Sequence, residues 1–139
     1  MKNKIILYLV LYFAILCKTV LAIEFSLKVS EINVTENGNL TTSSDGLAIS
    51  SDKDIEIEAK KFFYKKNLNQ LIAEDGVLKI SSKNIIIKFQ KLINNRNNFE
   101  IFSDENIEIK ETNKNLNIIT SKITYNNKSG ILCQIPKLK

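Results

Sequence analysis

Ile57-Glu58-Ala59-Lys60-Lys61-Phe62-Phe63-Tyr64 is a stretch that the chain repeats twice more, and this repetition decides the fold that the sequence predicts. Its counterparts are Ile87-Lys88-Phe89-Gln90-Lys91-Leu92-Ile93-Asn94 and Ile118-Ile119-Thr120-Ser121-Lys122-Ile123-Thr124-Tyr125. The interval from Lys61 to Lys91 is 30 residues and that from Lys91 to Lys122 is 31. Each block is followed by a polar turn and a second apolar burst: Leu71-Ile72-Ala73, Phe99-Glu100-Ile101-Phe102 and Ile131-Leu132-Cys133. A fixed period of this length indicates stacked units, here of two strands and two turns, that bury their apolar faces only against their neighbours.

Within the repeats, apolar and polar residues alternate as a half-buried strand requires. Ile55, Ile57 and Ala59 alternate with Glu56, Glu58 and Lys60. Near the start of the repeats, Phe25, Leu27 and Val29 share one parity, whereas Ile32 and Val34 share the other. The change of phase at Ser30-Glu31 predicts a bulge or a switch of face.

Turn signals separate the bursts at intervals of roughly 8 to 12 residues, the spacing of a sandwich, jelly roll or solenoid. They are Asn37-Gly38, Asp45-Gly46, Asp75-Gly76, Ser129-Gly130 and the Asn-rich stretch 94–98. Gly and Asn tolerate the positive φ of tight hairpin turns. No apolar period of three to four residues persists for a dozen residues, so we expect no long helix.

The first 22 residues differ from the rest and predict a signal peptide. Lys2 and Lys4 precede an apolar run from Ile5 to Leu16, and the segment ends on Ala22, which predicts cleavage after that residue. Spanning a membrane needs roughly 20 apolar residues, and Lys18 interrupts this run, which disfavours an uncleaved anchor. A lipoprotein signal ending at Cys17 is disfavoured by Leu16. The predicted division is a signal helix over 1–22 and one domain over 23–139.

Cleavage changes both the charge and the cysteine content. Three lysines and no acid leave, so 20 basic residues become 17 against 15 acidic ones and the net charge falls from +5 to +2. Arg96 is the only arginine, and the remaining basicity does not indicate nucleic-acid binding. Cys133 remains alone, either as a buried small hydrophobe, which its strand-like surroundings favour, or as an intermolecular partner.

Few residues are suited to catalysis or to holding a cofactor. The chain has no His and no Trp, which excludes His-based triads and His metal sites. Asp52, Asp54, Glu56 and Glu58 would align on one face of a strand, but no Gly-containing calcium loop accompanies them. We expect no enzyme activity, no metal and no cofactor.

The apolar face is therefore the candidate site. It fills a core if the stacked hairpins close, and it lines a groove for acyl chains if they stay open; the residues alone leave both possibilities. The candidate residues are Ile55, Ile57, Ala59, Leu71, Ala73, Ile87, Phe89, Phe99, Ile101, Ile107, Ile109 and Ile118.

The first repeat resembles the repeat of the OstA/LptA family. The family pattern of an apolar residue, Ala, Tyr, a polar turn, then Leu, Ala and Val is matched by Ile57, Ala59, Tyr64, Leu71, Ala73 and Val77. The segments 31–39 and 45–49 also resemble the opening of LptD-type periplasmic domains. Lys60 stands where the family favours Asp, Asp75-Gly76 replaces a Gly-first turn, and Asn94 replaces Tyr in the middle repeat.

The resemblance implies an all-β fold, an open β-jellyroll or folded sheet of stacked hairpin repeats. It implies a periplasmic bridge that carries lipopolysaccharide towards the outer membrane and shields the acyl chains of lipid A in an apolar groove. It further implies head-to-tail joining to other Lpt domains by β-augmentation. The resemblance leaves open an LptA-like protein or an LptD-like fragment, and the residues leave open a structural β-solenoid or surface-fibre module with a closed core and no lipid.

Overall fold

The computed structural model describes the backbone of residues 25–136 and the side chains of residues 25–133. The predicted signal peptide lies outside this range. The described chain forms one antiparallel sheet of eight strands in sequence order. The strands are β1 (Phe25–Thr35), β2 (Leu40–Ser50), β3 (Ile55–Lys65), β4 (Gln70–Ile80), β5 (Ile85–Asn95), β6 (Glu100–Glu111), β7 (Leu116–Asn126) and β8 (Ile131–Pro136). The predicted all-β fold of stacked hairpins is confirmed, and the described helices are three short 3₁₀ turns, η1 (Glu36–Gly38), η2 (Lys66–Leu68) and η3 (Ser81–Lys83).

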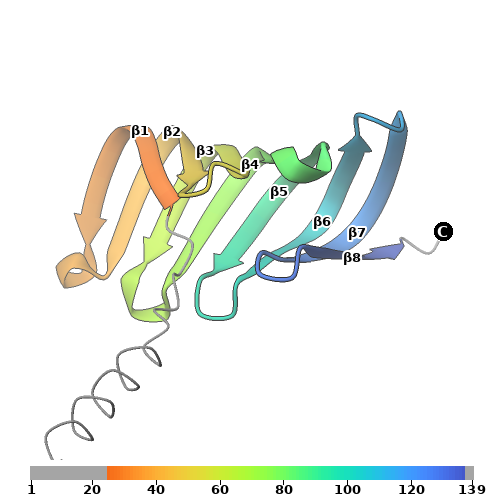
Figure 1. The fold of residues 1–139 in the computed structure, drawn as a ribbon. Coiled ribbons are helices and arrows are strands. Elements are labelled where there is room, and N and C mark those ends of the chain that lie inside the picture. The colour runs from red at the N-terminus through yellow and green to blue at the C-terminus, as the bar shows by residue number, and fades with distance from the viewer. Residues whose placement is uncertain (1–24, 137–139) are drawn as a thin grey trace, which may run out of the picture.

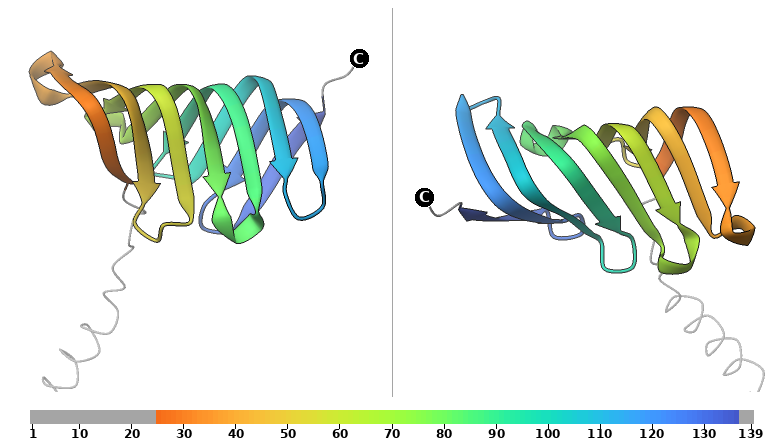
Figure 2. Two further views of the ribbon diagram at one scale, coloured as in Figure 1. Left: turned by 90° about the horizontal axis from the view of Figure 1, so that it is seen from above. Right: turned by 180° about the vertical axis from the view of Figure 1, so that it is seen from behind.

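Each long strand bends in its middle, so that the sheet folds over and its two halves face each other (Figures 1 and 2). We call this line of bends the crease. Along β3 the buried residues are Ile55, Ile57 and Ala59 before the crease and Phe62 after it, while Lys60 and Lys61 are both exposed. The parity of the inward side chains therefore switches at the crease. Residues of both parities reach the same interior, which an unbent strand does not allow.

The crease corrects the prediction of turns at Asp45-Gly46 and Asp75-Gly76, because both pairs lie in the middle of strands, in β2 and β4. Asp45 has φ 40° and Asp75 has φ 52°, and this left-handed backbone reverses the pleat. Successive hairpin turns are about 15 residues apart, as the starts of η2 and η3 at Lys66 and Ser81 show, rather than 8 to 12. The switch of face predicted in β1 at Ser30-Glu31 is opposite Asp45 and belongs to the same crease.

In β6, the second strand of the middle repeat, the crease takes a different form. Glu105 and Asn106 both have positive φ, and the pairing of β6 with β7 shifts between Asp104 and Ile107. This bulge gives β6 one more residue than its neighbours, since β6 has 12 residues and β5 has 11. The extra residue explains why the sequence interval grows from 30 to 31.

The hairpin turns stack on one another along both rims of the folded sheet. On one rim the backbone N–H of Lys66 donates to Asn39 O at 2.8 Å, and that of Arg96 donates to Asn69 O at 3.1 Å. On the other rim, the N–H of Ser81 donates to Asp54 O at 2.9 Å. Each repeat therefore places its turns on those of the repeat before it, which fixes the stacking that the period predicted.

Candidate functional site

The interior between the two halves of the sheet is apolar and packed. Phe62 is the largest side chain among those with at most 1% of their surface exposed, and Leu78 and Leu92 are also fully buried there. Ten of the candidate residues are buried there: Ile55, Ile57, Ala59, Leu71, Ala73, Ile87, Phe89, Ile101, Ile107 and Ile109. The structure therefore gathers them into one cluster drawn from both halves of the sheet.

Two candidate residues are placed differently. Ile118 is half-buried and packs against the edge of the cluster. Phe99 precedes β6 in the turn, with φ 60°, and the Nζ of Lys128 lies 5.9 Å from the centre of its ring. Phe99 thus lies at the rim and is not among the residues of the buried cluster.

The candidate list omits several interior residues because they lie beyond the crease. Phe62, Leu92, Ile123 and Tyr125 are buried in the second halves of their strands. A strict alternation along each strand, counted from Ile57, Ile87 or Ile118, assigns these positions to solvent. The sequence does mark this change of parity. Two successive exposed polar residues, Lys60-Lys61 in β3 and Gln90-Lys91 in β5, lie where the parity changes. The same shift settles the face of Phe62 and Phe63, of which Phe62 is the inward one.

At the β1 end the inner face is exposed. Ile32 pairs with Ser43, which pairs with Phe62, so Ile32 shares the face of a buried core residue. Nevertheless 66% of Ile32 and 57% of Val34 are exposed, because β1 is an edge strand and no strand beyond it covers them. Leu27, Ile32 and Val34 together form an exposed apolar strip on β1, at the open end of the interior.

Polar groups inside the cluster mostly have partners. The Ser103 hydroxyl donates to Lys91 O at 2.7 Å, and the Ser50 hydroxyl accepts from the N–H of Ile55 at 2.9 Å and donates to Asp52. That last bond holds the pKa of Asp52 below its usual range. Asn94 is the exception, because it is 1% exposed and neither atom of its amide has a hydrogen-bond partner.

The four clustered carboxylates do not share one face. Asp52 and Asp54 lie in the turn between β2 and β3, and the Asp54 carboxylate accepts bonds from the N–H of Ser82 at 2.6 Å and from its hydroxyl at 2.8 Å. Burial raises the pKa of Tyr125, and the negative charges of Asp54 and Asp52 raise it further. Within residues 25–136 no three His, Cys, Asp or Glu side chains come together as metal ligands.

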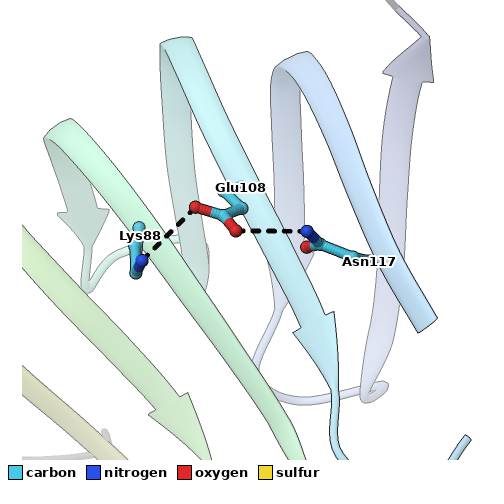
Figure 3. Close-up of polar contacts among 3 residues, drawn as sticks. All are labelled: Lys88, Glu108 and Asn117. Carbon is cyan, nitrogen blue, oxygen red and sulfur yellow. Dashed lines mark hydrogen bonds and ion pairs between the residues drawn. The ribbon is translucent and has the colours of Figure 1, made fainter. Parts of the chain in front are cut away.

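The outer face of the sheet carries charged residues and one half-buried apolar row, formed by Phe63, Ile72, Ile93 and Phe102. Figure 3 shows one row across three strands, in which the Glu108 carboxylate accepts a bond from the Asn117 amide at 3.2 Å and forms an ion pair with Lys88 at 3.4 Å. The Asn117 bond and then Lys88 lower the pKa of Glu108. A second pair, between Lys79 and Glu56 at 4.0 Å, lies on the same side. The interior is therefore mainly apolar, whereas the outer face presents both charged and apolar side chains.

The sheet ends on two unpaired strand edges, because β1 pairs only with β2 and β8 only with β7 among the described strands. The two strands lie at opposite ends of the folded sheet (Figure 1). The expectation of a buried Cys133 is wrong, since the thiol is exposed on β8. Its neighbour Leu132, paired with Tyr125, takes the inward position instead.

Among solved structures, the fold is similar to that of LptH, described as the LptA-homologous periplasmic component of the lipopolysaccharide transport device of Pseudomonas aeruginosa. The TM-score is 0.65 over 82% of this chain and 83% of that chain, at 6% sequence identity. No protein-family model matches the sequence, and no curated protein does so. The predicted OstA/LptA-like fold is confirmed, and at this identity the similarity concerns the fold alone. Within the described residues no helix is both long and apolar enough to cross a membrane.

Proposed function

We propose that this chain is a periplasmic carrier or bridge domain for lipopolysaccharide, in which the inner face of the folded sheet shields the acyl chains of lipid A. One observation carries the proposal: the apolar inner face continues from the packed core to the exposed strip on β1. Each methylene that leaves water for such a surface contributes about 0.8 kcal/mol. Leu27, Ile32 and Val34 offer that surface without any rearrangement.

The deeper part of the interior takes a chain only if the two halves of the sheet move apart. Ile57, Leu78 and Ile87 are fully buried and fill the space there. An acyl chain that enters therefore replaces contacts between the halves with contacts to itself, which are equally apolar. Lipid is expected at the β1 strip first and at Phe89 after the halves separate.

The proposal includes joining to other Lpt domains through the free edges of β1 and β8. Unpaired edges are normally blocked in soluble proteins because they add strands from other chains. Here β1 is 11 residues long and carries exposed apolar side chains. A partner strand that pairs with it would also cover the strip and extend the apolar surface into the next domain.

The remaining parts of the proposal follow from the sequence. The signal peptide predicted over 1–22 would deliver the domain to the periplasm. The domain would act without catalysis or a cofactor, because carriage along an apolar face needs neither.

A structural module with a closed core is the second candidate, and the packing of the interior favours it. Ten candidate residues are buried in a cluster, as a core without cargo requires. Such a module would assemble with itself and would bind no lipid.

Photo-crosslinking separates the two candidates. Benzoylphenylalanine at Phe89 places the probe in the interior, and the same substitution at Phe102 places it on the outer face of the neighbouring strand, beside Lys122. A third probe at Ile32 tests the strip. We expect lipopolysaccharide adducts at Ile32 and Phe89 and none at Phe102. Folded protein that gives no adduct at either inner position would remove the carrier function and leave the structural module.

The proposed joining to other Lpt domains through the edges of β1 and β8, here called the joint, is tested by hydrogen exchange. Adding a partner Lpt domain is expected to slow exchange of the β1 or β8 amides and to leave β4 and β5 unchanged. Unchanged exchange at both edges in a mixture that forms a complex would place the joint elsewhere.

A further inference from the structure

A small cavity lies where the start of β1 meets the turn after β5. Its volume is about 90 Å³, and its lining is Phe25, Leu27, Tyr64, Leu71 and Arg96. The lining combines three apolar side chains with one phenol and one guanidinium. It adjoins the exposed strip, since Leu27 belongs to both.

The backbone of the repeat fixes the position of Arg96. Its N–H donates to Asn69 O at 3.1 Å, just as the N–H of Lys66 donates to Asn39 O one repeat earlier. Lys66 is exposed, whereas Arg96 is partly buried and lines the cavity. The two cations therefore occupy equivalent turn positions, and one of them, Arg96, lines a half-open pocket.

The guanidinium of Arg96 lacks a full set of partners. Its Nε is buried and has no hydrogen-bond partner. The ion pairs found within the described residues use Lys60, Lys79, Lys88 and Lys114. Leaving a buried donor unsatisfied costs about 1–3 kcal/mol, and more when the group is charged. A guanidinium always carries its charge, and its fork of N–H donors matches a carboxylate or a phosphate.

A second unsatisfied group lies in the adjoining inner row. Asn94 pairs with Leu71 across β4 and β5, and Leu71 pairs with Tyr64 across β3 and β4, so the three share the inner face. Both amide atoms of Asn94 are buried without a partner. The interior around the cavity thus has spare hydrogen-bonding capacity beside an apolar surface.

We propose that this cavity binds the anionic head of an amphiphile, a carboxylate or a phosphate monoester on an alkyl chain. Arg96 pairs with the head, and Phe25, Leu27 and Leu71 contact the first methylenes. The volume equals roughly three waters of about 30 Å³ each, which suits a head group and not a chain. The chain then runs along the inner side of β1 past Val29, Ile32 and Val34. This inference rests on the proposed function and specifies which part of the lipid the β1 end recognises.

The test compares ligands that differ only in their head. Undecanoate, decyl phosphate and uncharged decanol, which share a ten-carbon alkyl chain, are titrated against the chain that begins at Ile23, by displacement of the uncharged dye N-phenyl-1-naphthylamine. We expect both anions to bind about tenfold more tightly than decanol, or better, which corresponds to about 1.4 kcal/mol. Arg96→Gln should bring this ratio close to one, and Arg96→Lys should leave part of it because the charge remains without the fork. Lys66→Gln is the matched control, with the same loss of charge at the equivalent turn, and should leave the ratio unchanged.

The outcomes separate this site from the carrier function. Equal binding of decanol and the two anions by the wild type, or an unchanged ratio in Arg96→Gln, overturns the head-group site and leaves the apolar strip as a lipid surface. Failure of all three amphiphiles to bind overturns both the head-group site and the carrier function. Inorganic phosphate that competes as strongly as decyl phosphate shows a site for a free anion and overturns the proposal.

Discussion

Gly76→Ala tests the crease directly, because the structure leaves no room there for a methyl group. Gly76 follows the bend of β4 at Asp75 and faces the interior between β3 and β5. A Cβ built on it would lie 2.2 Å from the Glu58 carbonyl oxygen, 2.7 Å from the Phe89 ring and 2.9 Å from the Ala59 Cβ. The nearest of these atoms belongs to the backbone of the adjacent strand and cannot rotate away.

The expected loss of stability follows from that overlap. Overpacking a core typically costs 1–3 kcal/mol, and because backbone must move here we expect about 3 kcal/mol or more. For a domain of this size about 1 kcal/mol corresponds to roughly 4 °C in Tm, so Tm should fall by about 12 °C or more.

Two other glycines provide the comparison. A Cβ at Gly46 would lie 2.4 Å from Val29 Cγ1 and 2.8 Å from the Lys28 carbonyl oxygen, but both residues belong to the edge strand β1, which can shift. Gly38 has φ 88° and nothing within 4 Å, so alanine there costs only backbone strain of about 1–2 kcal/mol. Urea unfolding followed by circular dichroism should rank the losses as Gly76, then Gly46, then Gly38. A Gly76→Ala variant as stable as Gly38→Ala would refute the close approach of strands at the crease.

Three further predictions concern stability, pH and the free thiol. Asn94→Leu should raise the free energy of unfolding by about 1 kcal/mol, because it removes two buried and unpaired polar atoms; a loss of stability in urea unfolding would show that the amide has a partner. The Ser50 bond lowers the pKa of Asp52 in the folded protein, so its contribution to stability is complete above the unfolded pKa of about 3.9 and is lost as pH falls through the lower folded value. Unfolding measured between pH 2 and pH 6 should show a smaller decline for Asp52→Asn than for Asp45→Asn, and equal declines would contradict that role. Cys133, the single thiol of the chain that begins at Ile23, is exposed and should react with Ellman's reagent in the native state as fast as in urea; reaction only after unfolding would mean that the thiol is covered.

The sequence by itself determined the class of fold, the repeat and much of the interior. Alternation is a local property, so Ile55, Ile57 and Ala59 identify their own buried face without knowledge of their neighbours. The regular spacing of Lys61, Lys91 and Lys122 likewise reflects stacked units of one kind. The one extra residue in the second interval corresponds to the bulge in β6.

Tertiary structure alone decided where the strands bend and what the bend brings together. An Asp-Gly pair is compatible with a hairpin turn or with a crease, and pairing with both neighbouring strands selects the crease for Asp75-Gly76. Once the sheet is folded, Phe25 and Arg96, 71 positions apart in the chain, line one cavity. No local pattern encodes that contact, because it depends on the distance between two halves of a sheet and not on the period of either.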